Sequence, residues 1–214
     1  MITYKRPKQC QEVLDQINAI GCSTKGILCI NGSDEYPEIN AIPVGWTIIK
    51  NQGNPGFIAT LNNVFHAYPK EKFYGFIADD EFIFTPEWDK KLIDAAGDWG
   101  LSNSNENWQS RARFQSYCCI GGELARSVGF LALPTCWHWY GFDNFWEYIF
   151  HHLKNRKFCY GVKSEHKHWR NGKVEKDDCH VAGDSKENED KQAFMEWLLS
   201  DGKDLIEKIR GKMK

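Results

Sequence analysis

Short apolar runs alternate with amphipathic helical patterns through the N-terminal half of the chain, and this alternation constrains the fold more than any other feature. Apolar runs typical of buried strands cover residues 26–30, 46–50 and 73–78, and residues 1–4 form a very short strand candidate. Apolar residues at helical spacing follow Pro7, Gly56 and Pro86. This order predicts an α/β fold with a mostly parallel central sheet and helices on both faces.

The second half of the sequence is less regular. We expect strands around 117–120 and 158–162, a helix over 145–153, and a C-terminal helical tail over 185–214. There is no internal repeat and no linker, and 214 residues suit one core. We therefore expect a single domain over residues 1–214.

Composition excludes several classes of protein. A net charge of −2 rules out a generally basic nucleic-acid binder, and 42% hydrophobic residues rule out a disordered chain. Eight scattered cysteines in a chain of this length, without a C-x-x-C pair, indicate reduced thiols rather than a disulfide framework. No apolar stretch has the length of a membrane span or of a signal peptide core. We expect a cytoplasmic protein without a membrane partner.

The acidic triplet Asp79, Asp80 and Glu81 is the sharpest local signal. It follows a buried strand, and three adjacent carboxylates repel one another unless a counter-charge such as a divalent cation is present. In an extended chain Asp79 and Glu81 point to the same side, so we expect these two to bind a metal. The alternative is a solvated acidic turn.

Two histidines, His166 and His168, form the second strong signal. At a spacing of two residues on an extended segment they point to one side, as metal ligands often do. Nitrogen ligands beside carboxylates favour Mn²⁺ over Mg²⁺. The alternative is a pair of surface histidines in a basic loop.

Five sequence blocks occur in the order found in one enzyme family. They are residues 3–7 (TYKRP), 31–33 (NGS), the loop and helix 51–62, the acidic block 76–81 with 85–88 (TPEW), and the segments 121–122, 129–130 and 140–143 (YGFD). With these blocks the chain resembles glycosyltransferases of the GT-A fold, specifically the family-2-like group. The resemblance extends from residue 3 to about residue 180.

The resemblance implies a single GT-A-like domain that transfers a sugar from a nucleotide sugar, usually a UDP-sugar, to a hydroxyl. Donor contacts are implied at Thr3, Tyr4, Arg6, Asn31, Gly32, Asn51, Gly56, Asp79 and Asp80. A manganese or magnesium ion is implied at Asp79, Glu81, His166 and His168, bridging the diphosphate. The acceptor side is implied at Gly121, Gly122, Trp137, Trp139, Tyr140 and Asp143. The chain departs from the family at Ile30, where an aspartate usually helps to hold the base.

Asp143 is the residue that the resemblance marks as the catalytic base. A carboxylate there can deprotonate an acceptor hydroxyl for a single displacement with inversion. Its place before a strongly apolar helical stripe also fits an ordinary helix N-cap. Trp137, Trp139 and Tyr140 precede it as an acceptor platform or as plain core.

Residues 151–176 carry eight Lys or Arg against two acids. This stretch is either a solvated surface or a face for a phosphate-rich acceptor such as DNA. Compact glycosyltransferases of bacterial viruses include enzymes that modify hydroxymethylated bases, which must be flipped out to react. Two rival functions are a metal-dependent nuclease and a catalytically degenerate module that binds a sugar nucleotide or carbohydrate.

Overall fold

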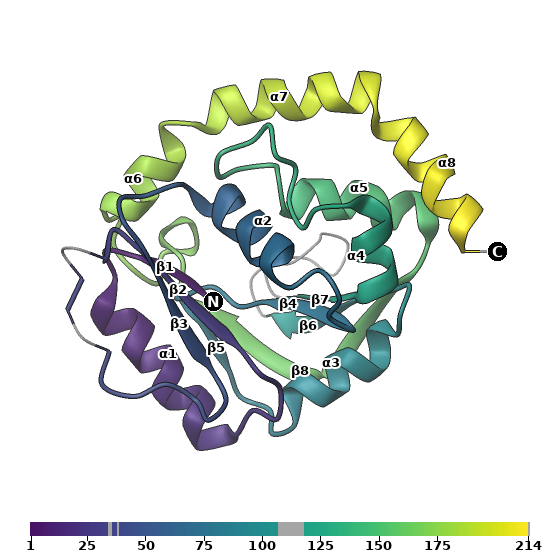
Figure 1. The fold of residues 1–214 in the computed structure, drawn as a ribbon. Helices are drawn as coiled ribbons and strands as arrows, with labels where there is room; N and C mark the ends of the chain where they lie inside the picture. Colours follow the sequence, from purple (N-terminus) through teal and green to yellow (C-terminus); the bar gives the residue numbers. More distant parts are fainter. Residues whose placement is uncertain (34–35, 38, 107–117, 214) are drawn as a thin grey trace.

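The computed structural model describes residues 1–33, 36–37, 39–106 and 118–213. Its strands form two sheets with helices on both sides (Figure 1). The first sheet has the order β1-β2-β3, with β1 Ile2–Tyr4, β2 Ile27–Asn31 and β3 Thr47–Asn51. The second has the order β4-β7-β6-β8-β5, with β4 Phe73–Phe76, β5 Glu81–Ile83, β6 Leu101–Glu106, β7 Cys118–Gly121 and β8 Arg156–His166.

The first sheet is parallel, whereas the second is mixed. Strand β7 runs antiparallel to both β4 and β6, and β5 runs antiparallel to β8. A parallel bridge between Ile2 and Ala78 joins the two sheets just beyond the end of β4. The expectation of a mostly parallel central sheet is therefore met in the first sheet only. The tight turn at Asp79 and Asp80 reverses the chain into β5, and this reversal was not visible in the apolar pattern.

Helices cover both faces of the sheets, as the alternation predicts, and each face has its own core. Helices α1 (Pro7–Ile20) and α3 (Trp88–Ala96) pack on one face around Leu14 and Leu92. Helices α2 (Phe57–Ala67), α4 (Gly122–Val128) and α5 (Asp143–Leu153) pack on the other around Phe145 and Trp146. Strands β2 and β7 between them are buried almost throughout, which explains their near-continuous apolar sequences.

The C-terminal region is helical over residues 187–212, as expected from its sequence, and a further short helix that was not predicted precedes that tail. It consists of α6 (Asp178–Asp184), α7 (Glu187–Ser200) and α8 (Gly202–Lys212), and residue 214 lies outside the described part. In Figure 1, α7 and α8 form an outer arc beyond α2, α4 and α5. Ile206 and Ile209 of α8 join the core beneath. Among the described helices, none combines the length and the apolar character that crossing a bilayer requires.

Strand register places the polar ends of several strands at one edge. In the first sheet Tyr4 pairs with Asn31, and Asn31 pairs with Asn51. The turn at Asp79 and Asp80 follows Ala78 at this same edge because Ala78 bridges to β1. Ligands of α/β sheets bind outside the carboxyl ends of the parallel strands, so this edge is where the fold favours a site.

Gly121 and Gly122 do not lie at that edge. Gly121 pairs with Phe73, the first residue of β4, and is therefore at the opposite end of the strands. A Cβ at either glycine would overlap backbone oxygen atoms, of Asp98 for Gly121 and of Glu71 for Gly122. This pair, expected on the acceptor side, therefore lies away from the pocket, and backbone packs closely against both glycines. The prediction for Tyr117 falls outside the described residues.

We expect Gly121→Ala to destabilise the protein by about 1–3 kcal/mol, since the added methyl group would force backbone atoms apart. Gly161→Ala is the matched control, because a Cβ at Gly161 in β8 meets no atom within 4 Å. Urea unfolding of both variants measures the difference. Equal stability of the Gly121 variant and the parent would contradict the packing explanation.

Candidate functional site

A pocket opens at the carboxyl ends of β1, β2, β4 and β8. Its cavity of about 170 Å³ far exceeds the roughly 10–15 Å³ that one water molecule needs, so it has room for a ligand group. Twelve of the residues predicted for a site line it: Thr3, Tyr4, Arg6, Asn31, Asp79, Asp80, Trp137, Trp139, Tyr140, Asp143, His166 and His168. Six others do not: Gly32, Asn51, Gly56, Glu81, Gly121 and Gly122.

The asparagine residues beside the pocket form a hydrogen-bonded network. The Asn51 amide donates to Asn31 Oδ1 at 2.9 Å, and the Asn31 amide donates to Thr60 Oγ1 at 3.0 Å. Thr60 in turn donates to the Gly56 carbonyl oxygen at 2.7 Å. Asn51 and Gly56 therefore support the pocket wall from behind, and the Asn31 side chain is largely occupied with its neighbours.

The acidic triplet spans a turn rather than a straight strand, which changes the expected ligand set. Asp79 and Asp80 form the turn, and Glu81 is the first residue of β5, paired with His166 of β8. Alternation along an extended chain therefore does not apply, and Asp79 and Glu81 do not form a pair. Burial, and then the carboxylate of Glu106, raise the pKa of Glu81 to about 8.

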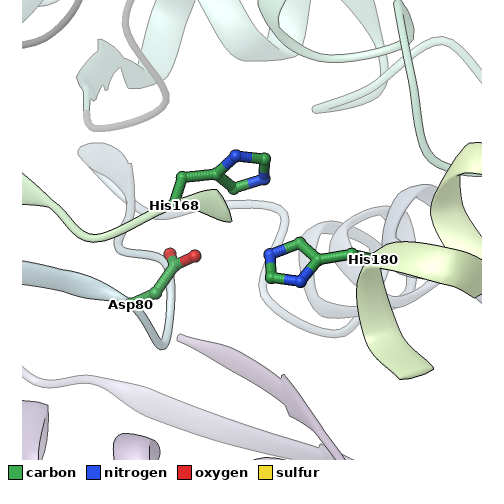
Figure 2. A group of neighbouring side chains, drawn as sticks. All are labelled: Asp80, His168 and His180. Carbon is green, nitrogen blue, oxygen red and sulfur yellow. The ribbon is translucent and has the colours of Figure 1, made fainter. Parts of the chain in front are cut away.

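A group that can hold a metal ion is formed by Asp80, His168 and His180. One ligand atom from each lies within 4.8 Å of the other two, and all three residues are buried. Figure 2 shows the three side chains converging from the β4–β5 turn, the segment after β8, and α6. One carboxylate with two imidazoles is a ligand set that suits Mn²⁺ and other transition metals better than Mg²⁺. Asp80 thus takes the place expected for Asp79 and Glu81.

Both histidines of this group are neutral near pH 7, as metal ligation requires. Burial lowers the pKa of His168 to about 3, and burial followed by the Arg6 charge lowers the pKa of His180. His168 is the N-cap of the short helix η2 (Trp169–Asn171), where its Nδ1 accepts the backbone N–H of Arg170 at 3.2 Å. The Asp177 carboxylate accepts the backbone N–H of His180 at 3.1 Å and so caps the start of α6.

His166 is bound between carboxylates. Its Nε2 lies 3.0 Å from Asp80 Oδ1, and its Nδ1 lies 3.6 Å from Glu106 Oε1. Burial opposes its charge, but Asp80 and the neighbouring glutamates outweigh burial and raise the pKa of His166 to about 9. His166 thus contacts Asp80 from outside the group that Asp80 forms with His168 and His180.

Arg6 connects the metal group to the rest of the pocket. Its Nη1 lies 3.2 Å from Asp79 and 3.4 Å from Asp80, and its Nε lies 2.7 Å from Asp177. Its Nη2 lies 2.6 Å from His180 Nε2, and because arginine only donates, that nitrogen accepts. The guanidinium and a metal ion would compete for this lone pair.

Aromatic residues and Asp143 also line the pocket. The Trp137 indole packs against Gly56, where a Cβ would lie 2.6 Å from its Nε1. The Arg170 guanidinium lies 4.4 Å from the centre of the Trp139 ring. Asp143 is the first residue of α5, after Phe142 at the N-cap position, so the N-cap interpretation is wrong. Burial raises the pKa of Asp143 to about 6.

Sequence reasoning missed four residues of this region. His180 and Asp177 carried a signal, since their spacing of three residues is that of a capping box at a helix start. Glu106 is hidden in the polar run of β6, which gave no strand pattern. Asp190, which binds the backbone of residues 137–139, lies on a helix with no distinguishing pattern.

We expect Asp80→Asn, His168→Ala and His180→Ala each to weaken Mn²⁺ binding at least about tenfold, because each removes one ligand. Glu81→Gln, by contrast, should leave the affinity near that of the parent. His66→Ala, an exposed histidine on α2, is the control. Paramagnetic resonance of free Mn²⁺ during titration gives the affinities. A loss confined to Glu81→Gln would restore the ligand set predicted from sequence.

No protein-family model matches this chain, and no curated protein matches it in sequence. The likeness to GT-A glycosyltransferases therefore depends on the five sequence blocks alone. What the fold adds is the position of the pocket, at the strand ends where α/β proteins bind ligands.

Proposed function

We propose that this protein is a metal-dependent glycosyltransferase that moves a sugar from a nucleotide-sugar donor, in the first instance a UDP-sugar, to an acceptor hydroxyl. One observation carries the proposal. The metal-capable group of Asp80, His168 and His180 lies in the same pocket as Asp143 and the aromatic residues of segment 137–140, at the carboxyl ends of the strands.

The pocket has two chemically distinct sides that fit the two halves of such a reaction. Arg6 supplies positive charge for a diphosphate, and the metal-capable group supplies ligands for a cation that would bind the diphosphate. Tyr4 lies beside them at the end of β1. A divalent cation at Asp80, His168 and His180 would offset the charge that develops on the leaving diphosphate. The aromatic residues that line the same pocket offer flat apolar faces of the kind on which sugar rings stack.

Asp143 is the residue proposed to act on the acceptor. It reaches the pocket from the first turn of α5, where burial raises its pKa and the charge of His166 opposes that rise. Burial brings its pKa to about 6, so it is ionised at neutral pH and still a stronger base than an ordinary aspartate. Direct attack by the deprotonated hydroxyl would invert the anomeric centre.

The basic stretch of residues 151–176 is the surface that would bind the phosphates if the acceptor were a hydroxymethylated base in DNA. Within it, Arg156 pairs with Glu147, Lys173 with Glu165, and Arg170 and Lys176 with Asp184. These partners neutralise half of the eight cations seen in the sequence. The DNA acceptor thus depends on the remaining basic side chains, and a simpler hydroxyl acceptor needs none of them.

We expect UDP-glucose with Mn²⁺ to raise the melting temperature by roughly 5–10 °C at about 100 times the dissociation constant, by mass action. Neither component alone should do so, and Asp80→Asn should abolish the shift. Thermal shift and release of UDP are the two measurements. Stabilisation without UDP release would favour a binding module, whereas Mn²⁺-dependent cleavage of DNA would favour a nuclease.

If Asp143 is the base, the rate should rise about tenfold between pH 5 and pH 7, as a carboxyl with a pKa near 6 loses its proton. Asp143→Asn should lower the rate by roughly 10²–10⁴ and remove this pH dependence. Asp204→Asn, an exposed aspartate on α8, is the control. A folded Asp143→Asn protein with a near-normal rate would remove Asp143 from the mechanism.

A further inference from the structure

Asp190 in the first turn of α7 is a buried carboxylate that the proposed reaction does not use. It is 3% exposed. Its Oδ1 accepts the backbone N–H of Trp137 at 2.7 Å, and its Oδ2 accepts those of His138 at 2.9 Å and Trp139 at 2.7 Å. Three consecutive N–H groups of one loop therefore converge on a single carboxylate from the C-terminal tail.

These bonds satisfy both partners at once. Residues 137–139 belong to neither a helix nor a strand, so their N–H groups have no regular partner. No lysine, arginine or histidine forms an ion pair with Asp190 among the described residues, and the three N–H dipoles stabilise its charge instead. Removal of the carboxylate would leave several buried donors without an acceptor.

The loop that Asp190 holds is one wall of the pocket, which we call the aromatic wall (residues 137–139). The Trp137 carbonyl oxygen accepts the N–H of Ile58 at the start of α2, and the His138 ring lies 5.7 Å from that of Phe57. All three wall residues line the pocket. The wall also leads directly into the turn before Asp143 on α5.

We propose that Asp190 is a positioning residue, which holds the aromatic wall in the shape that binds the sugar of the donor. The part of this inference that concerns the sugar rests on the proposed function. The dependence of the wall on Asp190 does not, since it follows from the hydrogen bonds alone. The C-terminal tail is thereby part of the binding site and more than a cover for the core.

The first test measures the wall itself. In Asp190→Asn, amide hydrogen exchange of a peptide covering residues 136–142 should become roughly 10- to 100-fold faster, as expected for the loss of charge-assisted hydrogen bonds. Glu189→Gln removes the same charge from the preceding residue, which is exposed and pairs with Lys186. This control should leave the exchange unchanged. Asp190→Glu keeps the charge and provides a milder variant with intermediate exchange.

The second test separates positioning from a general loss of stability. In Asp190→Asn the KM for UDP-glucose should rise about tenfold or more, while the affinity for Mn²⁺ stays that of the parent, because the metal group lies on other elements. Unchanged exchange in residues 136–142, an unchanged KM, or a parallel loss of Mn²⁺ affinity would each overturn the positioning role. Absence of UDP release by the parent protein would contradict the proposed function only, and the exchange rates would still decide whether Asp190 holds the wall.

Discussion

One buried guanidinium, that of Arg6, joins segments that are far apart in the sequence. It contacts the β4–β5 turn through Asp79 and Asp80, and it contacts α6 through Asp177. Leaving a buried charge without its partner costs about 3–5 kcal/mol, so the buried pairs with Asp79 and Asp80 hold the β4–β5 turn strongly in place. The metal-capable group depends on this arrangement, because Asp80 and His180 both contact Arg6.

The sequence predicted those parts of the fold that have a regular apolar pattern. The strands of the first sheet, helices α1, α2, α3 and α5, and the helical tail were visible as apolar runs or periodic apolar residues, whereas α4 and α6 were not. Strand β6 was not, because its residues 101–106 are mostly polar, and its serine side chains bond to a backbone oxygen of α3 and to Ser164 of β8. Without β6, the antiparallel pairing in the second sheet could not be anticipated.

The candidate site was predicted in outline, but the metal-capable group of the structure contains Asp80 rather than the predicted Asp79 and Glu81. Asp79, Asp80 and the two histidines do line one pocket, yet a turn brings Asp80 to His168 and directs Glu81 toward Glu106. The geometry of a turn is set by its backbone dihedral angles, and three consecutive acidic residues carry little information about those angles. His180 could not be linked to them from sequence, since a contact across about a hundred residues leaves no local pattern.

The pairing of Ile2 with Ala78 is the one β-bridge between the two sheets among the described residues, and both residues line the pocket. Thr3 and Asn31 belong to one sheet, whereas Asp80 and His166 belong to the elements of the other. A ligand that contacts both groups would hold the two sheets together at this bridge. The stiffness of the pocket is then a property of the loaded protein, set jointly by the chain and by what it binds.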